Sequence, residues 1–300
     1  MERALYDPDT GFYATTGHAG RRGDFVTSPE VGPLFGAVVA RALDGWWHEL
    51  GRPDPYWVIE GGAGPGTLAR TVAAAEPTCA DVWRYVAVER SEVQRSRHPD
   101  WVESRPDLPD GPVTGVVLAN ELLDNLPFDL THGGDPVDVE EGPAGRTLVP
   151  EVDIDDCEPD CIRARAWLAA ALDLVERGRV VVIDYTDRGG RRQWLRTYRE
   201  HESGGHPLDD PGRQDITIDV PVAQLAEVRT PSHQSTQADW LVRWGIESLV
   251  ADGRRVWQER AHLGDLEAVA ARSRVSEAEA LTDLGGLGGF SVLEWIANGE

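Results

Sequence analysis

A buried strand that runs directly into a glycine-rich turn and then a helix most constrains the fold of this chain. Trp57 to Ile59 form a short apolar run, Glu60 closes it, and residues 61–66 are rich in glycine. Residues 67–75 then have the composition of a helix. This order is typical of the first nucleotide-binding unit of a doubly wound sheet, where glycines let the backbone pass close to a ligand.

The spacing of these glycines indicates which ligand the turn accepts. A dinucleotide fingerprint, Gly-x-Gly-x-x-Gly, would need a glycine at position 67, where Thr67 stands. S-adenosylmethionine (SAM) has no phosphate, and its methionine end is cationic, so an acid at the strand end can serve it directly or through water. We therefore predict SAM as the cofactor, with an ordinary tight turn as the alternative. The predicted ligands in this segment are Glu60, Gly62, Gly64 and Gly66.

A second predicted strand, Tyr85 to Val88, ends at another acid, Glu89. In doubly wound sheets the ribose hydroxyls arrive at this position, and a carboxylate can accept hydrogen bonds from both hydroxyls. Glu89 is therefore our predicted ribose ligand. The alternative is a solvated acid at a strand end.

Three polar residues follow the next predicted strand, Val113 to Ala119. They are Asn120, Glu121 and Asp124. Ligands of open α/β sheets bind outside the carboxyl ends of the strands, so we expect all three to face the methyl donor. Asn120 is assigned to the cofactor, and Glu121 and Asp124 to catalysis, because carboxylates can orient a cationic or protic nucleophile and take up its proton. The alternative is that Asn120 and Asp124 only cap the next turn.

Composition limits the partners of the chain. The net charge of −23 disfavours nucleic-acid binding and favours cationic partners, including arginine-rich protein segments, although the charge can also serve solubility alone. Lysine is absent, which excludes a Walker A loop and Schiff-base chemistry. Cys157 and Cys161 lack a second ligand pair at zinc spacing, so we expect free thiols and no metal site, with a metal or redox pair as the alternative. No apolar run reaches membrane-spanning length and no signal segment opens the chain, so we expect a cytoplasmic protein.

The remaining expectations concern secondary structure. Residues 97–112 are read as loop, residues 131–161 as an acidic excursion with a hairpin, and residues 186–212 as a polar, arginine-rich flexible loop or a nucleic-acid patch. Asp184 ends a predicted strand at 180–183, and Gly178 is expected to stop the helix before it. Further strands are expected at 215–220 and, as an edge strand, at 287–295. Helices are expected at 37–50, 161–177, 222–228, 236–250, 255–271 and 275–281.

Together, these and other motifs resemble the MidA-like SAM-dependent methyltransferases, whose mitochondrial relatives assist respiratory complex I assembly. The resemblance runs nearly end to end and is carried by an ordered set of motifs rather than by the glycine turn alone. The set comprises residues 5–8 with 11–13, 23–30, 35–36, 60–66, 120–127, 184–185, 195–198, 201, 215–217, 236–237, 240–241 and 245–246. Two departures are Thr186, where the family has glycine after Asp-Tyr, and Glu92, where it has proline after serine.

The resemblance implies a doubly wound, mostly parallel, seven-stranded Rossmann-like α/β sheet with helical additions at the N-terminus and after the fifth strand. The expected segments are an N-terminal cap (1–50), a SAM-binding core (51–185), a substrate-side insertion (186–250) and C-terminal helices with an edge strand (251–300). From the residues alone, the segment 23–25 either closes over the cofactor or belongs to a helical cap. By resemblance, Gly23, Asp24 and Thr27 border the cofactor, and the substrate side holds Asp184, Arg196, His201, Asp215 and Gln237.

The activity implied is methyl transfer from SAM to a nitrogen or oxygen nucleophile. Protein arginine is the acceptor that the resemblance favours, since relatives studied in mitochondria are regarded as protein arginine methyltransferases. Two alternatives stay open: a methyltransferase for a small molecule, and a SAM-binding assembly factor with little turnover. Nucleic-acid methylation draws only on the arginine-rich stretch, and the overall acidity opposes it.

Overall fold

The computed structural model describes residues 1–7, 9–15, 27–143, 145–186, 194–199 and 202–299. It divides into two compact units, and each unit combines several stretches of sequence. The first unit consists of Met1–Phe25, Glu121–Ala171 and Asp184–Thr230, and the second of Val26–Asn120, Leu172–Ile183 and Pro231–Glu300. The chain passes from the second unit to the first after Asn120, where one strand ends, and after Ile183, one residue before another strand ends.

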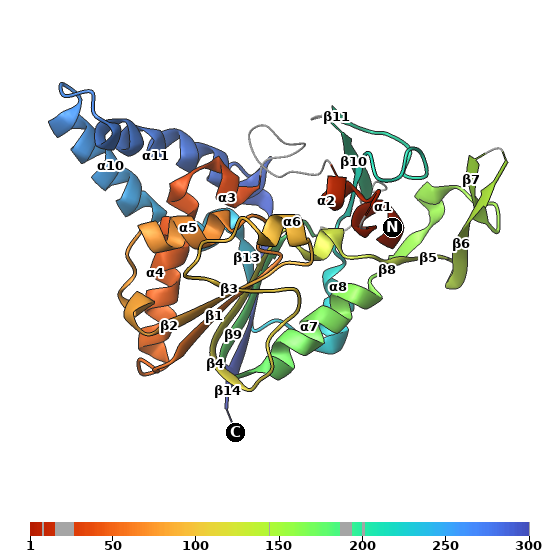
Figure 1. Ribbon diagram of the computed structural model, residues 1–300, viewed down its shortest axis with the longest axis horizontal. Coiled ribbons are helices and arrows are strands. Elements are labelled where there is room, and N and C mark those ends of the chain that lie inside the picture. Colours follow the sequence, from red (N-terminus) through yellow and green to blue (C-terminus); the bar gives the residue numbers. More distant parts are fainter. Residues whose placement is uncertain (8, 16–26, 144, 187–193, 200–201, 300) are drawn as a thin grey trace. The chain divides into compact units, whose positions relative to one another are not determined.

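The second unit is built on a seven-stranded sheet of order β13-β14-β9-β4-β1-β2-β3 (Figure 1). The pairs β1–β2, β1–β4, β2–β3 and β4–β9 are parallel, and β13–β14 is antiparallel. The predicted doubly wound, mostly parallel α/β fold is thus confirmed. The strands are β1 (Tyr56–Gly61), β2 (Trp83–Val88), β3 (Glu103–Arg105), β4 (Val113–Asn120), β9 (Val175–Asp184), β13 (His233–Thr236) and β14 (Ser291–Asn298).

Helices accompany this sheet, and the apolar runs of its central strands are buried, as a sheet covered on both faces requires. The helix α4 begins at Pro33, which suits a first helical position because it lacks an N–H to satisfy. Three fully buried tryptophans, Trp46, Trp240 and Trp295, are among the largest side chains of this core. The helices are α3 (Ser28–Val31), α4 (Pro33–Glu49), α5 (Thr67–Ala74), η1 (Thr78–Asp81), α6 (Glu92–Arg95), α9 (Gln237–Arg243), α10 (Ile246–Arg260), α11 (Leu266–Thr282) and η4 (Leu287–Gly289).

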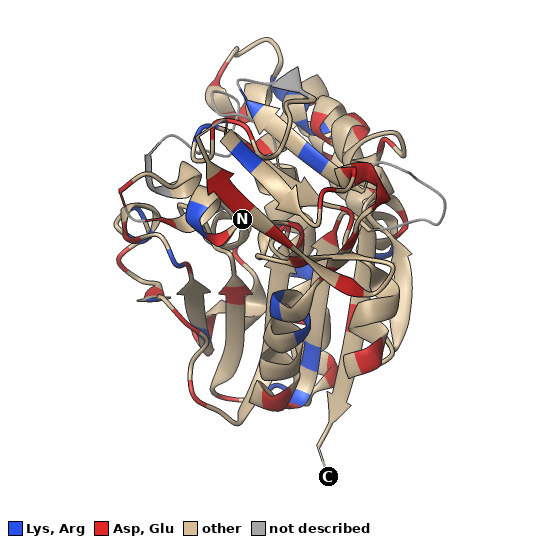
Figure 2. Cartoon of the chain, turned by 90° about the vertical axis from the view of Figure 1, so that its right-hand side faces the viewer, with Lys and Arg blue, Asp and Glu red and all other residues tan. Residues whose placement is uncertain are grey.

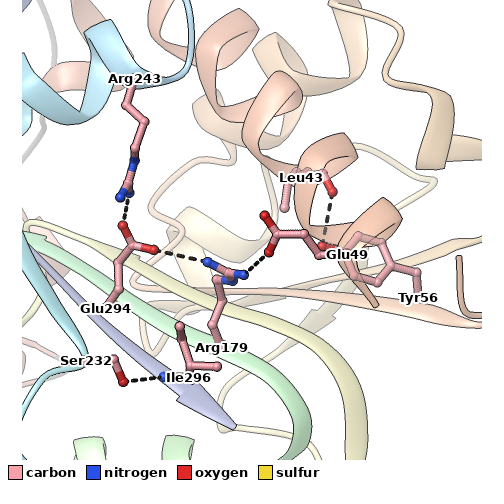
Figure 3. A network of polar contacts seen from close by, with 8 residues as sticks. All are labelled: Leu43, Glu49, Tyr56, Arg179, Ser232, Arg243, Glu294 and Ile296. Carbon is pink, nitrogen blue, oxygen red and sulfur yellow. Dashed lines mark hydrogen bonds and ion pairs between the residues drawn. The ribbon is translucent and has the colours of Figure 1, made fainter. Parts of the chain in front are cut away.

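A buried ionic network connects four elements of the second unit (Figure 3). Glu294 of β14 is 1% exposed and accepts hydrogen bonds from Arg179 of β9 and Arg243 of α9. Arg179 also pairs with Glu49 and lies over the ring of Trp46, 4.8 Å from its centroid. Both charges of the central pair are thus compensated, as burial of ions demands.

The first unit carries two small antiparallel sheets, of order β11-β10-β12 and β7-β6-β5-β8. The acidic excursion predicted at 131–161 forms most of the second of these, and its hairpin β6–β7 closes at the pair Gly142 and Gly145. The strands are β5 (Asp129–His132), β6 (Asp135–Gly142), β7 (Gly145–Val149), β8 (Glu158–Asp160), β10 (Leu195–Arg199), β11 (Glu202–Ser203) and β12 (Asp215–Ile218). The helices are α1 (Glu2–Tyr6), α2 (Phe12–Thr15), η2 (Leu123–Asn125), η3 (Ile154–Asp156), α8 (Val222–Val228) and α7 (Ile162–Leu174), which enters the second unit after Ala171.

Three expectations for the middle of the chain were wrong in detail. The loop at 97–112 contains β3, and the arginine-rich stretch contributes β10. The helix expected at 161–177 ends at Leu174, and Gly178 lies inside β9 rather than at a helix end. Gly178 has a φ of 138°, and a Cβ there would come within 1.7 Å of the Gly115 carbonyl oxygen, so glycine allows β4 and β9 to approach.

The C-terminal expectations also need correction. The helix expected at 236–250 is split by Gly245, whose φ of 83° is left-handed, into α9 and α10. The pair expected at 255–271 and 275–281 is instead the end of α10 and one continuous helix, α11, whose N-cap Asp265 accepts a hydrogen bond from the Ala268 amide. The final strand is not an edge, because β13 covers it.

Acidic residues, red in Figure 2, outnumber arginines by 52 to 29. Within the described ranges, no helix combines the length and the apolar character needed to cross a bilayer.

Candidate functional site

The glycine turn between β1 and α5 is open at its centre. Gly64 has a φ of 51°, and a Cβ added there would meet nothing within 4 Å. Its amide donates a 3.0 Å hydrogen bond to Oε2 of Glu89, which follows β2. The predicted ribose ligand therefore also anchors the turn, and the free space before Gly64 is the kind of cradle in which a ligand approaches backbone closely.

Glu60, in β1, is 6% exposed and accepts a 2.6 Å hydrogen bond from the hydroxyl of Tyr85 on the adjacent strand. Burial raises the pKa of Glu60 to about 7, the charge of Glu89 adds to that rise, and the Tyr85 bond opposes it. A carboxyl in this state is ready to ionise when a cation approaches, because a nearby positive charge favours its charged form.

Glu89 is held by two backbone amides. Besides Gly64, the amide of Ser91 donates to its Oε1 at 2.8 Å. Burial raises the pKa of Glu89, while these backbone hydrogen bonds and the charge of Arg95 lower it. Each carboxylate oxygen has two lone pairs, so Glu89 retains capacity to accept from a ligand hydroxyl. Its ribose role, like the cofactor roles of Glu60, Gly62, Gly64 and Gly66, stays a prediction.

His98, which the sequence analysis left in a loop, also contacts the backbone of this turn. Its Nε2 lies 2.8 Å from the Gly64 carbonyl oxygen, and its Nδ1 lies 2.8 Å from the Ser104 hydroxyl. Since a carbonyl only accepts, Nε2 carries a proton. Burial lowers the pKa of His98, which favours the neutral ring. A histidine in a Pro- and Asp-rich stretch carries no sequence signal for this contact.

The last residue of β4 and the residue that follows it have different roles in the backbone. Asn120 is the last residue of the strand and is partly buried. Glu121 has a φ of 51°, a left-handed conformation that costs a non-glycine residue on the order of 1–3 kcal/mol and is common at functional sites. This bend takes the chain from β4 toward η2 and Asp124. The roles assigned to Asn120 and Glu121 stay predictions.

Three buried carboxyl groups of the first unit come from three segments of sequence, and Asp124 interacts with each of the other two. Asp124 accepts a 2.5 Å hydrogen bond from the Thr217 hydroxyl, and Asp184 accepts a 2.8 Å bond from the Leu123 amide. Asp215 accepts from the hydroxyl of Tyr13 at 3.0 Å and from the amide nitrogen of Asn125 at 3.4 Å. Asp124, Asp184 and Asp215 are each at most 3% exposed.

Burial raises the pKa of every member of this cluster. The charge of Asp124 raises it further for Asp184 and Asp215, whereas a hydrogen bond with Asp184 lowers the pKa of Asp124. The pKa of Asp184 lies well above its usual range because of burial and the charge of Asp124. Burial raises the pKa of Asp124 to about 6, against its hydrogen bond to Thr217. The pKa of Asp215 is raised to about 7, again by burial first and then by Asp124. Among the described residues, no group of His, Cys, Asp and Glu has the arrangement of a metal site.

Of the other predicted substrate-side residues, Arg196 acts on this cluster, because its charge lowers the pKa of Asp124, whereas Gln237 lies in the second unit. Arg196 forms an ion pair with Asp219 and lies over the ring of Tyr185, 5.0 Å from its centroid. Gln237, in the second unit, is fully buried, accepts from Ser28 at 2.9 Å and donates to the Leu281 carbonyl at 3.1 Å. A substrate role for Arg196 and Gln237 stays a prediction.

Of the residues expected to border the cofactor, Thr27 is described and stands as the N-cap of α3 without a side-chain cap bond. Gly23, Asp24 and His201 fall outside the described residues.

The structure thus brings together Glu60, Glu89 and the glycine turn in one unit, and Asp124, Asp184 and Asp215 in the other. The sequence analysis missed the groups that hold these acids. The hydroxyl of Tyr85 donates to Glu60 on the neighbouring strand, and the hydroxyl of Thr217 donates to Asp124. The hydroxyl of Tyr13 donates to Asp215, which is 202 residues away in sequence. Contacts of this range are not visible in sequence spacing.

Comparisons with known proteins identify the family and the fold of this chain. The model of a family described as "Putative S-adenosyl-L-methionine-dependent methyltransferase" matches residues 38–136 and 156–239. The mitochondrial protein arginine methyltransferase NDUFAF7 homolog of Drosophila melanogaster is 26% identical, over 78% of this chain and 67% of its own length. NDUFAF7 of Xenopus laevis is 23% identical, over 73% of this chain and 63% of its own. The chain thus spans about two thirds of these relatives.

Among solved structures, a COG1565 superfamily member from Burkholderia thailandensis bound to S-adenosyl-homocysteine has the same fold. It superposes with a TM-score of 0.81 at 24% identity, over 98% of this chain and 86% of that one.

Proposed function

Because this chain belongs to the MidA-like family of SAM-dependent methyltransferases, we propose that its methyl acceptor is the guanidinium group of a protein arginine. One observation carries the acceptor class: three buried carboxyls, Asp124, Asp184 and Asp215, lie in the first unit, and the charge of Asp124 raises the pKa of the other two. A cation beside them relieves that repulsion and restores their ionised form. A neutral acceptor would leave the repulsion in place.

The glycine turn fits the cofactor on two counts. The space before Gly64 accommodates a ligand close to the backbone, and the two acids beside it can serve polar and cationic groups. When bound, SAM supplies a methyl group on a positively charged sulfur. We assign Glu60 to the cationic end of the cofactor and Glu89 to its ribose, with Gly62, Gly64 and Gly66 forming the turn around it.

Asp124 has the central role on the acceptor side. Its ionised carboxylate orients the guanidinium, so that one nitrogen presents a lone pair to the methyl group. The nitrogen exchanges an N–H bond for an N–CH3 bond, and the proton released passes to a carboxylate. A group with a pKa of about 6 is mostly ionised at neutral pH and can still take up a proton. Glu121 provides a second carboxylate in the same segment.

The relatives support the same acceptor. Both are named as protein arginine methyltransferases, and they match this chain over most of its length. The net charge of −23 is suited to a cationic protein segment.

The test is transfer of label from methyl-tritiated SAM to proteins in a lysate of the source organism, followed by acid hydrolysis and identification of the labelled amino acid. We expect methylarginine. Asp124→Asn and Glu60→Ala should each reduce the label at least about 100-fold, because one removes the proton acceptor and the other an acid of the cofactor site. Asp209→Asn, an exposed acid of the same unit as Asp124, is the matched control and should retain activity.

Label in a low-mass extractable fraction would show that the methyl acceptor is a small molecule rather than a protein arginine. SAM binding by calorimetry without any labelled product would indicate an assembly factor instead.

A further inference from the structure

The first unit contains a cavity of about 200 Å³, lined by both apolar and acidic residues, that no role assigned so far uses. It lies where two hydrophobic clusters of this unit meet, one around Leu5 and Phe12 and the other around Val137 and Leu148. The side chains that form its apolar wall are Leu130, Val137, Ile154, Leu195, Leu208 and Ile216.

This cavity and the carboxylate cluster use opposite faces of the same small sheet. Successive residues of a strand point to opposite faces, and in β12 Ile216 lines the cavity while its neighbours Asp215 and Thr217 belong to the carboxylate cluster. In β10 the pattern repeats, since Leu195 lines the cavity and the next residue, Arg196, pairs with Asp219. A ligand in the cavity is therefore separated from Asp124 by the thickness of one sheet.

The size of the cavity favours a side chain over a whole small molecule. Sites for drug-sized ligands usually have volumes of about 300–1,000 Å³, and this one is smaller. Its apolar wall would take one aliphatic or aromatic side chain, whose full burial contributes about 1.5–3 kcal/mol.

The rim of the cavity is acidic. Asp129 and Asp138 line it and are exposed, as is Val139. Residues 129–160, which form the sheet β7-β6-β5-β8, contain eleven acids and a single arginine, so they carry −10 of the net charge of −23. Ten of these acids are exposed. Two acids of the segment have arginine partners, Glu141 with Arg146 and Asp160 with Arg165.

We propose that this cavity is a docking site for one apolar side chain within a basic segment of the protein substrate, held at a distance from the arginine that is methylated. The proposal rests on the proposed function and names how the substrate is selected. The acidic sheet attracts the cationic segment, and the cavity fixes its register. Because an extended chain covers about 3.3 Å per residue and must pass from one sheet face to the other, the docked residue and the target arginine are on the order of four to eight residues apart.

Charge argues against the other occupants. A second copy of the chain also carries −23 and would bring like charges together at this rim. An anionic lipid or fatty acid meets the same repulsion. A basic segment is the occupant whose charge complements the rim.

The experiment is fluorescence anisotropy with labelled 12-residue peptides. Each peptide carries one target arginine, several further arginines or lysines, and one leucine placed two to ten residues from the target. In a charge control, glutamine replaces the further arginines and lysines. We expect a preferred leucine position at which leucine→alanine weakens binding at least about five-fold, since the buried side chain is lost. Val139→Lys should weaken the same peptide about ten-fold by placing a cation at the rim.

The matched control is Val149→Lys, on the neighbouring strand β7. Val139 and Val149 are 48% and 40% exposed, but Val149 does not line the cavity. We expect its effect to stay within about two-fold. Equal losses for the two variants, or no dependence on leucine at any position, would overturn the docking site. Sedimentation that shows a dimer dissociated by Val139→Lys would assign the cavity to a second copy and also overturn it.

The readouts separate this proposal from the proposed function. If a peptide binds through its leucine but receives no methyl group on arginine, the docking site is supported and the proposal that arginine is the methyl acceptor is contradicted. If arginine is methylated equally with and without the leucine, the proposal of an arginine acceptor is supported and the docking site is contradicted.

Discussion

Asp124 and Thr217 are joined by a 2.5 Å hydrogen bond although 93 residues separate them in sequence. The hydroxyl donates to Oδ2 of the carboxylate, and both side chains are buried. This bond lowers the pKa of Asp124 against the larger effect of burial, which raises it. Thr217 thus controls the ionisation of the carboxylate that we place at the acceptor.

Thr217→Val should raise the pKa of Asp124 above its value of about 6, because the methyl group that replaces the hydroxyl cannot donate. We expect turnover at pH 7 to fall about ten-fold and to recover as the pH is raised toward 9. Thr217→Ser keeps the donor and should retain the original profile. The measurement is the pH dependence of kcat, with Thr147→Val, an exposed threonine of β7, as control. A uniform loss at every pH in Thr217→Val would refute the role in ionisation.

His98 is a positioning residue of the glycine turn. His98→Ala removes the donor to the Gly64 carbonyl, and a lost hydrogen bond to a partly buried group costs about 1–3 kcal/mol. We expect the Kd for SAM and the KM for SAM to rise about ten-fold with little change in kcat. Ser104→Ala, which removes only the partner of Nδ1, should raise the Kd about two-fold. If kcat falls while the KM for SAM is unchanged, the turn does not depend on His98.

The affinity for SAM should depend on pH through Glu60. Burial raises the pKa of Glu60 from 4.5 to about 7, and a cationic ligand group favours the ionised form. Binding must therefore displace a proton below pH 7, and the affinity should fall as the pH falls, by at most about ten-fold per pH unit. Calorimetry in buffers of different ionisation enthalpy should detect the released proton at pH 6. Glu60→Gln should bind more weakly without this pH dependence, and identical pH slopes for the two proteins would rule out our assignment.

The fold was largely predictable because its signals are local. The apolar runs that end at Glu60, Glu89 and Asn120 gave three neighbouring parallel strands of the sheet. The misplaced elements lacked such signals: β13 has the polar sequence His-Gln-Ser-Thr and is a strand because it pairs with β14. The sequence predicted that Gly178 ends a helix. In the structure, glycine is needed there because a Cβ would clash with the backbone of Gly115 on another strand.

The candidate site was predictable only in its acids. A carboxylate at the end of an apolar run can be recognised from spacing, which located Glu60, Glu89 and Asp124. The groups that set their pKa values, Tyr85 and Thr217, come from elsewhere in the sequence, and nothing in their own surroundings marks them. The direction of each pKa shift also depends on burial, which appears only when the units fold.

Asp215 should make the protein more stable in mild acid than at pH 8. Its folded pKa of about 7 lies above its ordinary 3.8, so the folded state binds the proton more tightly, and this stabilisation is lost as the pH rises from about 4 to about 7. Asp215→Asn keeps an oxygen that can accept from Tyr13 and removes the charge. We expect it to exceed the original protein by on the order of 2 kcal/mol at pH 8 and to match it at pH 5. Urea unfolding at both pH values measures this, and an equal difference at both would contradict the ionisation argument.

Glu294 should be the most sensitive member of the buried ionic network in Figure 3. Its carboxylate is 1% exposed and neutralises Arg179 and Arg243, so Glu294→Gln leaves the buried charge of Arg179 with reduced compensation. Removing one partner of a buried pair costs about 3–5 kcal/mol. Glu49→Gln removes the other partner of Arg179, but the Glu49 side chain is 58% exposed, and such pairs contribute about 0–1 kcal/mol. Thermal and urea unfolding of the two variants should differ accordingly. Equal destabilisation by both would mean that water reaches Glu294 and that the network adds little to the stability of the second unit.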